Sequence, residues 1–259
     1  MKTLVGQRAC VTGASAGIGR ATAFRLAQMG AEVIVLARRK ERLEQLVMEV
    51  IEEGGSMRAA PIDLNDLDAL RDLLAKELAQ GPVTILVNNV SGPPPGRLLE
   101  AKVADFQAAF GPHLFAAQTL VQECLPGMEE SGYGRIINVI STSVREPIPN
   151  LGVSNTVRGA MASWSKTLAR ELPSGVTVNN VLPGFTDTER LSALKAHLAQ
   201  TRGVTEAEVE AAWLATVPEG RLGQPSEVAA AIGFLASPEA GFIRGVNLAV
   251  DGGRTTSIA

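Results

Sequence analysis

A glycine-rich stretch near the start of the chain is the first whose residue types and spacing could form a binding site. Thr12-Gly13-Ala14-Ser15-Ala16-Gly17-Ile18-Gly19 follows a short apolar run and leads into a stretch with apolar residues at helical spacing, which Gly30 ends. A strand, a glycine loop and a helix in this order are typical of a site for a dinucleotide pyrophosphate. Gly13 permits a tight turn, Gly17 lets backbone amides approach phosphates, and Gly19 lets the helix pack closely on the strand. The sequence therefore predicts a nucleotide at the amino end of this helix.

The residues after the second predicted strand indicate which dinucleotide binds. Dinucleotide folds often place a carboxylate there, which accepts hydrogen bonds from the adenosine ribose. This chain has Ala37 at that place, followed by Arg38 and Arg39. A guanidinium pairs with a 2′-phosphate, whereas a carboxylate repels it. We therefore predict NADP(H) in preference to NAD(H); the alternative is that both arginines only begin a solvated helix.

Alternating strands and helices would position these residues. Predicted strands cover residues 9–11, 32–37, 57–62, 83–87, 135–140, 176–181 and 246–250. Predicted helices cover residues 20–29, 40–53, 66–80, 102–130, 151–172 and 225–236. Because nearly continuous apolar strands alternate with helices, we expect a doubly wound, Rossmann-type α/β fold. It would have one seven-stranded parallel sheet with helices on both faces, in a single domain over residues 1–259.

Residues 185–218 fall outside this alternation. They contain two polar helical patterns, over residues 189–200 and 205–216. A long excursion beyond the carboxyl end of a strand usually covers a ligand, so we predict a substrate-covering helical lid here. Its apolar residues indicate either an apolar substrate or the lid's own core: Leu191, Leu194, Leu198 and Trp213. A surface insertion without a role in binding is the alternative.

Composition excludes several classes of partner. The formal net charge is −3 and no basic block is present, so we do not expect nucleic-acid binding. No apolar run approaches the length that spans a membrane. Cys10 and Cys124 show no metal-ligand spacing and lie in apolar contexts, which is typical of buried free thiols in a reducing compartment. Since the first eight residues are too few and too polar for a secretory signal, we expect a cytoplasmic protein without a metal.

The glycine loop, with three residues between its first two glycines, resembles that of the short-chain dehydrogenase/reductase family. Other stretches also look like the family: Asn88-Asn89-Val90-Ser91, Pro183-Gly184-Phe185-Thr186-Asp187-Thr188, Arg221-Leu222-Gly223, Phe234-Leu235-Ala236-Ser237 and Val250-Asp251-Gly252-Gly253. The resemblance covers essentially the whole chain and is strongest to the 3-oxoacyl-carrier-protein reductase branch. It implies a set of cofactor-binding residues: Gly13, Ser15, Gly17, Ile18, Gly19, Arg38, Arg39, Asp63, Leu64, Asn89, Pro183, Gly184, Thr186 and Thr188. In this family the residue at Asp63 contacts the adenine, and the Pro183–Thr188 stretch holds the nicotinamide amide.

The catalytic positions that the resemblance implies are altered. The family uses a Ser after the fifth strand, a Tyr-x-x-x-Lys in the next helix and an Asn in the long preceding helix. Ser141 supplies the first serine, but Ser154 and Arg158 stand at the Tyr and Lys positions. His113 stands at the Asn position. Tyr133, the one tyrosine of the chain, precedes the fifth strand in a predicted loop, so it does not replace the missing tyrosine.

These replacements change what the site can do with a proton. An aliphatic hydroxyl is a far weaker acid than a phenol, whose pKa is ~10, so Ser154 would orient a carbonyl but release a proton poorly. Arg158 would stabilise an oxyanion but would not deprotonate. His113 has a side chain whose usual pKa, ~6.5, suits proton transfer at neutral pH. We predict that Ser141, Ser154 and Arg158 polarise a carbonyl and that the proton comes from His113 or water. Ketone reduction would then fall as pH rises through the histidine's pKa, which a nearby Arg158 would lower.

Two alternatives remain open at this point. His113 could be a hydrogen-bonded helix residue that anchors Arg158 or a backbone carbonyl. The whole chain could be either an NADP(H)-dependent oxidoreductase or a nucleotide-binding protein without turnover, such as a sensor or an assembly subunit. As an enzyme it would transfer hydride between nicotinamide and a 3-oxoacyl-like carbonyl or alcohol, as a small molecule or bound to an acyl carrier.

The two long predicted helices also suggest self-association. Residues 102–130 and 151–172 carry more apolar side chains than one sheet face should cover: Leu114, Phe115, Leu120, Val121, Val157, Met161, Trp164 and Leu168. Members of the family often pair these helices. We therefore predict a homo-oligomer, with a tetramer as the expected form.

Overall fold

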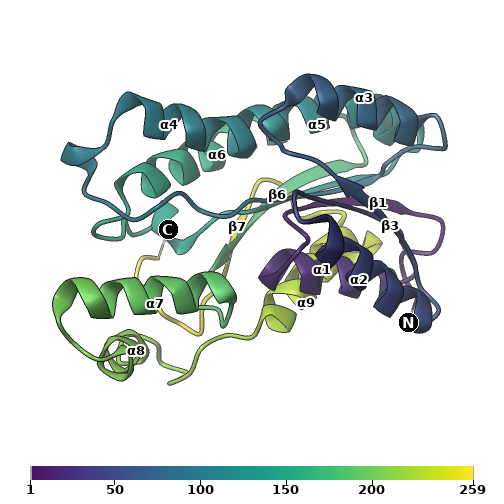
Figure 1. The fold of residues 1–259 in the computed structure, drawn as a ribbon. Helices are drawn as coiled ribbons and strands as arrows, with labels where there is room; N and C mark the ends of the chain where they lie inside the picture. The colour runs from purple at the N-terminus through teal and green to yellow at the C-terminus, as the bar shows by residue number, and fades with distance from the viewer. Residues whose placement is uncertain (1, 259) are drawn as a thin grey trace.

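The computed structural model describes residues 2–258 and contains one sheet of seven parallel strands (Figure 1). The strands are β1 (Arg8–Thr12), β2 (Glu32–Ala37), β3 (Ser56–Pro61), β4 (Ile85–Asn89), β5 (Gly134–Val139), β6 (Val176–Pro183) and β7 (Asn247–Val250). Their order across the sheet is β3-β2-β1-β4-β5-β6-β7. The strand order reverses between β1 and β4, which is the place where open α/β sheets bind ligands. The predicted doubly wound fold is confirmed.

Helices cover both faces of the sheet (Figure 1). On one side lie α1 (Gly17–Gln28), α2 (Lys40–Glu52) and α9 (Pro225–Ala236). On the other side lie α3 (Leu67–Leu78), α4 (Val103–Phe110), α5 (Ala116–Glu130) and α6 (Gly152–Glu171). Along β1, Ala9 and Val11 join the apolar core beneath α1, whereas Cys10 joins the core beneath α3 and α5. Burial on both faces explains why the strands read as almost entirely apolar.

The helix predicted over residues 102–130 is interrupted. Between α4 and α5 the chain makes a π-helical turn over Gly111–Phe115. Pro112 causes the change, because proline has no backbone N–H to donate and its ring clashes with the carbonyl four residues earlier. A widened turn absorbs that clash and is a frequent feature of functional sites. Within this turn His113 is buried, with 5% of its surface exposed.

The apolar side chains that suggested self-association are largely used within one chain. Leu120, Val121, Val157 and Met161 are each at most 3% exposed. Leu114, Trp164 and Leu168 are half-buried, and Phe115 is the exposed member of the set, at 49%. The expectation that these helices carry excess apolar surface is therefore wrong for half of the residues named. The helices fill the core of their own sheet instead.

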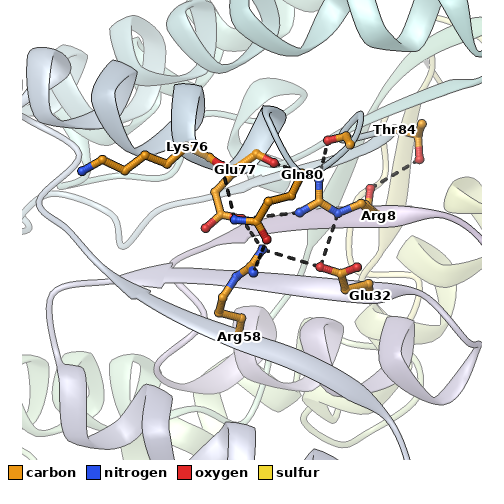
Figure 2. A network of polar contacts seen from close by, with 8 residues as sticks. Arg8, Glu32, Arg58, Lys76, Glu77, Gln80 and Thr84 are labelled. Atoms are coloured by element: carbon orange, nitrogen blue, oxygen red, sulfur yellow. Dashed lines mark hydrogen bonds and ion pairs between the residues drawn. The ribbon is translucent and has the colours of Figure 1, made fainter.

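Charged side chains join the amino ends of three strands to the end of α3 (Figure 2). Glu77 is buried, and Arg8 Nη2 and Arg58 Nη2 both pair with its carboxylate. The Glu32 carboxylate lies 3.3 Å from Arg8 Nε and 3.5 Å from Arg58 Nη2. Arg58 Nη1 also donates to Gln80 Oε1 at 2.7 Å. Because this network lies at the opposite edge of the sheet from the glycine loop, it belongs to the scaffold.

The segment after β6 forms two helices, α7 (Glu189–Arg202) and α8 (Glu206–Leu214). They stand apart from α1 and α2, at the lower left of Figure 1. The Thr188 hydroxyl caps α7 by accepting from Leu191 N at 3.2 Å, and Gly203 ends that helix at a φ of 67°. Trp213 stacks on Phe185, with ring centroids 4.9 Å apart. The predicted pair of helices is confirmed, and Trp213 packs within the segment itself.

Among residues 2–258, no helix has the length and apolar character needed to cross a membrane. Within the same range, no three His, Cys, Asp or Glu side chains gather where they could hold a metal ion. The Cys10 and Cys124 thiols are free and buried, as predicted. Burial raises the pKa of Cys124 to about 12, so this thiol stays protonated.

Candidate active site

The glycine loop joins the carboxyl end of β1 to α1 and is closed by Asn89. Gly13 has a φ of 60°, and a side-chain carbon there would lie 2.3 Å from Asn89 O, so only glycine fits. Asn89 Nδ2 donates to Gly13 O at 3.2 Å. The Thr12 hydroxyl accepts from Asn89 N at 2.8 Å and donates to Asn89 O at 2.9 Å. Asn89 therefore fixes the loop against β4 rather than reaching outward.

The start of α1 is open to an anion. Ala16 provides no side-chain cap, and the first turn carries no acidic residue. Among residues 2–258, the first N–H groups of the helix thus lack a side-chain acceptor. Gly19 is buried in that turn, and Ile18 packs against the core beneath the helix. The loop and helix present the backbone donors and the positive helix end that bind a pyrophosphate.

The arginine pair lies on one side of the glycine loop. Arg39 Nε and Nη2 donate to the Ser15 hydroxyl at 3.1 and 3.0 Å. Arg39 Nη1 also lies 3.5 Å from a carboxylate oxygen of Glu189, at the start of α7. Arg38 is exposed, and its charge contributes to lowering the pKa of Asp63. The structure thus brings Arg39 to Ser15 and places the charge of Arg38 near Asp63.

The loop after β3 holds the next two predicted residues. Asp63 Oδ1 accepts from Asn65 N and from Asn65 Nδ2, each at 3.0 Å. The backbone hydrogen bond from Asn65 is the main reason that the pKa of Asp63 is lowered. Leu64 is 9% exposed and belongs to the core beneath α3 and α5. Asp63 therefore stays ionised at the edge of the site, whereas the Leu64 side chain is directed into the core.

The segment after β6 approaches the glycine loop from the other side. A side-chain carbon at Gly17 would lie 3.1 Å from the Thr188 methyl group, so the two loops are in close contact. Thr188 Oγ1 donates to Thr186 O, and Thr186 Oγ1 donates to Gly184 O, both at 3.3 Å. Pro183 ends β6, where it pairs with Val250 of β7. The predicted nicotinamide-side residues thus adjoin the predicted phosphate site.

Arg158 lies at the centre of the predicted catalytic group. It projects from α6 and is 8% exposed. Its Nη1 donates to Val139 O at 2.8 Å and to Ile140 O at 2.9 Å, and its Nη2 donates to Val90 O at 3.3 Å. The guanidinium therefore ties α6 to the chain after β5 and after β4. Burial, together with the charge of Arg190, lowers the pKa of Arg158 to about 10, so it remains charged at neutral pH.

Of the two predicted catalytic serines, Ser154 lies near this guanidinium, and Ser141 is next in the chain to one of its carbonyl partners. Ser141 follows Ile140, and its hydroxyl oxygen accepts from Ser143 N at 3.1 Å, which leaves its proton free to donate. Ser154 is half-buried, one helical turn before Arg158 on α6. Its Oγ and Arg158 Nη2 both lie within 4 Å of the position that a side-chain carbon of Gly92 would take. Ser154 and Arg158 are thus brought together beside the loop after β4.

His113 is held in one tautomer. Its Nδ1 lies 2.8 Å from Ala109 O. Since a carbonyl only accepts, Nδ1 carries the proton and Nε2 is a bare acceptor. Nε2 is buried and has no hydrogen-bond partner among the described residues. Burial, followed by the charge of Arg158, lowers the pKa of His113 to about 3.

This pKa corrects the expected role of His113. The sequence predicted that Arg158 would lower the histidine's pKa, and the direction is confirmed. At neutral pH the ring is uncharged, and its one N–H is used by Ala109. A lowered pKa favours the alternative that His113 is a hydrogen-bonded helix residue and that the proton comes from water. The ring can still accept a hydrogen bond at Nε2.

A cavity of about 450 Å³ lies next to His113. The loop after β4, from Ser91 to Arg97, forms one wall, and α4 with the π-helical turn forms another. His113 and Val153 also line it. Of the predicted catalytic residues, His113 lines this cavity, whereas Ser141, Ser154 and Arg158 are not among its lining residues. The cavity has room for a substrate next to His113.

Two further residues escaped the sequence analysis. Arg190, in the first turn of α7, donates from Nη2 to Pro93 O at 2.7 Å and so reaches the loop after β4. Gly92 lies beneath it, with the Nη2 atoms of Arg158 and Arg190 on the side where a side chain would project. Arg190 lies two residues after Thr188, a predicted cofactor residue, and this position in the sequence could have indicated that it belongs to the site. Tyr133 lies in a loop as predicted, and its hydroxyl donates to Ala236 O.

Comparisons with known proteins agree with this geometry. The family described as enoyl-(acyl carrier protein) reductase matches residues 13–255. The 3-oxoacyl-[acyl-carrier-protein] reductase FabG of Vibrio cholerae is 37% identical over 253 residues, which are 96% of this chain and 98% of that protein. Among solved structures, L-sorbose reductase from Gluconobacter frateurii, complexed with NADPH and L-sorbose, has a TM-score of 0.93 at 27% identity, with 100% of both chains covered.

A second similar solved structure is named for the same activity as the Vibrio relative. It is the 3-oxoacyl (acyl-carrier-protein) reductase from Agrobacterium tumefaciens with NADP bound, and its TM-score is 0.88 at 28% identity. The match covers 97% of this chain and 95% of that one. The fold, the glycine loop and these matches together show that the chain belongs to the short-chain dehydrogenase/reductase family, among homologues of the FabG-type reductases.

Proposed function

We propose that this protein is an NADP(H)-dependent reductase that transfers hydride to a carbonyl substrate through an atypical active site. One observation carries the proposal. The open amino end of α1 and the Arg39–Ser15 contact lie on the same edge of the sheet as the buried group around Arg158. A phosphate site and a polarising cation at one edge of the sheet are parts that such a reaction needs.

The residues present fit NADPH. Backbone N–H groups at the start of α1 suit the pyrophosphate, and Arg39 with Ser15 suits the 2′-phosphate. When bound, NADPH supplies the hydride, which carries two electrons to the carbonyl carbon. Two similar solved structures also support NADPH as the cofactor, since one holds NADP and the other NADPH.

This chain's own residues would act on the carbonyl oxygen. Ser141 and Ser154 donate hydrogen bonds to it, and the positive charge of Arg158 stabilises the negative charge that develops there. The oxygen then takes a proton from water, and the hydroxide that remains is neutralised by bulk solvent. His113 Nε2, an acceptor that faces no protein donor, orients that water. No residue here has to lose or gain a charge during the reaction.

Turnover with purified protein tests this proposal. NADPH oxidation is followed with a panel of ketones and with a 3-oxoacyl thioester, since the acyl-carrier relatives make that substrate a candidate. The proposal predicts ketone-dependent oxidation that Ser141→Ala reduces by about 100-fold. Tight NADPH binding without turnover on any carbonyl would instead support a nucleotide-binding sensor or assembly subunit. That second function draws on one observation: three donors of Arg158 already serve backbone carbonyls.

We also propose that the protein forms a homo-oligomer, with a tetramer as the expected form. Exposed apolar residues near the β7 edge of the sheet support self-association better than the apolar residues of α5 and α6 do. Phe242 is fully exposed and Phe234 is 43% exposed. Light scattering at micromolar concentration tests this, and a monomer would contradict it.

A further inference from the structure

The chain after β7 is hydrogen-bonded to the loop that follows β5. Residues 251–258 make up this segment, the C-terminal strap. Thr256 and Ser257 each donate a backbone N–H to Glu146 Oε1, at 2.7 and 2.8 Å, and the Thr256 hydroxyl donates to the same oxygen at 3.0 Å. Figure 1 shows the end of the chain, marked C, between α6 and α7 in the view. The strap therefore lies beside the loop that carries Ser141.

Arg254 connects the strap to two loops of the site. Its Nη1 donates to the hydroxyl of Thr142, the residue after Ser141, at 3.1 Å. Its guanidinium carbon lies 4.6 Å from the centre of the Phe185 ring, in the stretch after β6. A cation over an aromatic ring is attracted by the negative face of that ring. One side chain thus contacts both the loop after β5 and the loop after β6.

Phe185 also contacts α8. The ring of Trp213 stacks on it, with the centroids 4.9 Å apart and the ring planes at 16° to each other. The backbone of Phe185 is held as well, since its carbonyl oxygen accepts from Gly223 N at 2.9 Å. Arg254, Phe185 and Trp213 therefore form a continuous set of contacts from the strap to the helical segment that is predicted to cover the substrate.

The turn that begins at Ser141 depends on Thr142. Ser141 precedes the short 3₁₀ turn Thr142–Val144, and its hydroxyl accepts from Ser143 N at 3.1 Å. Thr142 is 2% exposed, and the hydrogen bond from Arg254 holds its hydroxyl. Because one planar peptide unit joins Ser141 to Thr142, a shift of Thr142 would move Ser141. A misplacement of ~1 Å in a reacting group can lower a rate by about 100-fold.

We propose that Arg254 is a positioning residue of the reductase. It fixes the turn that carries Ser141 and, through Phe185, the position of α8 relative to that turn. This rests on the proposed function and adds a residue that acts on the site from the strap. The partners of Arg254 are a protein hydroxyl and a protein ring, so its effect is on geometry. The cofactor phosphates have separate donors, at the start of α1 and at Arg39.

The kinetics of Arg254 variants test this role. Arg254→Leu removes the charge and the donors, so kcat with a ketone should fall by about 10- to 100-fold, while the dissociation constant of NADPH stays close to that of the wild type. Arg254→Lys keeps a charge and a donor, so it should recover most of the loss. Arg202→Leu is the matched control, since Arg202 is exposed at the end of α7, and its kcat should equal that of the wild type. A wild-type kcat in Arg254→Leu, or equal losses in kcat and in NADPH affinity, would overturn the positioning role.

A second substitution tests the contact with the hydroxyl. Thr142→Val removes the acceptor of the Arg254 hydrogen bond and keeps the branched shape of the side chain. In that background, Arg254→Leu should cause little further loss of kcat, because the contact between the two residues is already absent. If the double variant instead lost the full product of the two single losses, Arg254 would not act through Thr142.

Trp213 provides a measurement that needs no turnover. Trp164→Phe leaves Trp213 as the one tryptophan of the chain. In this background, the Trp213 emission should move to longer wavelength in Arg254→Leu, because the Phe185 ring on which it stacks loses its contact with the strap. Arg254→Lys and Arg202→Leu should leave the emission as it is. Unchanged emission in Arg254→Leu would overturn the link from the strap to α8.

The two kinds of measurement separate this inference from the proposed function. A wild-type protein that reduces no ketone would contradict the reductase, whereas a shifted Trp213 emission in Arg254→Leu would still support the hold of the strap on α8. Ketone reduction at an unchanged rate in Arg254→Leu, with unchanged emission, would leave the reductase standing and overturn the positioning role of Arg254.

Discussion

Arg158 Nη1 donates a hydrogen bond to the carbonyl oxygen of Val139 at 2.8 Å, which joins the middle of α6 to the last residue of β5. The same nitrogen also reaches Ile140 O, and Nη2 reaches Val90 O. One side chain thus holds two loops at the carboxyl edge of the sheet while it keeps its charge inside the protein. This makes Arg158 both a structural and an electrostatic part of the site.

Replacing Arg158 should therefore affect stability and turnover together. Arg158→Met removes the donors of three carbonyls, so it should lower the free energy of unfolding by about 2 kcal/mol or more. Arg158→Lys keeps a charge and up to three donors, so it should recover part of that loss. Urea unfolding measures the stability, and NADPH oxidation measures the turnover. An Arg158→Met variant with wild-type stability and rate would show that Arg158 contributes to neither folding stability nor turnover.

The cofactor preference should depend on Arg39. Arg39→Ala removes the guanidinium that contacts Ser15 and should weaken NADPH binding by about tenfold or more, with NADH binding little changed. Fluorescence titration with both cofactors measures the two dissociation constants. Lys40→Ala is the matched control, because Lys40 is exposed and its ion pair is with Glu44 at 3.6 Å. If Arg39→Ala weakened NADPH and NADH binding equally, Arg39 would not be the residue that binds the 2′-phosphate.

The fold could be predicted almost completely from the sequence, because it depends on local patterns. Apolar strands buried on both faces alternate with helices, and the helix over Pro225–Ala236 has the bounds predicted. The π-helical turn around Pro112 was not predicted. A proline shows where hydrogen bonding must fail but does not specify whether the helix bends, ends or widens.

The chemistry of the site was harder to predict, because it depends on burial and on distant partners. The residue type of His113 gives a pKa near neutrality, whereas its buried place beside Arg158 lowers that pKa to about 3. Likewise, Arg158 could be predicted to carry a charge, but its three carbonyl partners come from segments up to 68 positions away. Arg190 meets Gly92 only through the fold.

The stability of the protein at acid pH should depend on His113. Its pKa is about 3 in the folded state against ~6.5 when unfolded, so the unfolded chain binds the extra proton between these values. Stability that is fully present above pH ~6.5 is therefore lost as pH falls towards 3, by about 2 kcal/mol at pH 5. His113→Gln should flatten this slope in urea unfolding, whereas His197→Gln, at an exposed position, should not. The same slope in wild type and His113→Gln would refute the buried neutral ring.

The network around Glu77 should matter for stability and not for cofactor preference. Glu77→Gln removes the buried carboxylate that Arg8 and Arg58 share and leaves the partly exposed Glu32 as the remaining carboxylate of the network, so the free energy of unfolding should fall by about 3 kcal/mol. Asp68→Asn is the control, because its carboxylate is almost fully exposed and its pair with Arg71 should contribute at most about 0.5 kcal/mol. Thermal or urea unfolding measures both variants. A loss in Glu77→Gln no larger than in Asp68→Asn would mean that solvent reaches the network.

Transfer of deuterium from deuterated NADPH tests the central claim most directly. The wild-type protein is incubated with NADPH that carries deuterium at the transferring position and with acetoacetate, and the product is analysed by mass spectrometry. The account predicts one deuterium on the carbon that becomes the alcohol carbon, and a yield that falls by about 100-fold in Ser141→Ala. A protein that binds NADPH but transfers no deuterium to acetoacetate, to its ester or to a 3-oxoacyl thioester would contradict the account.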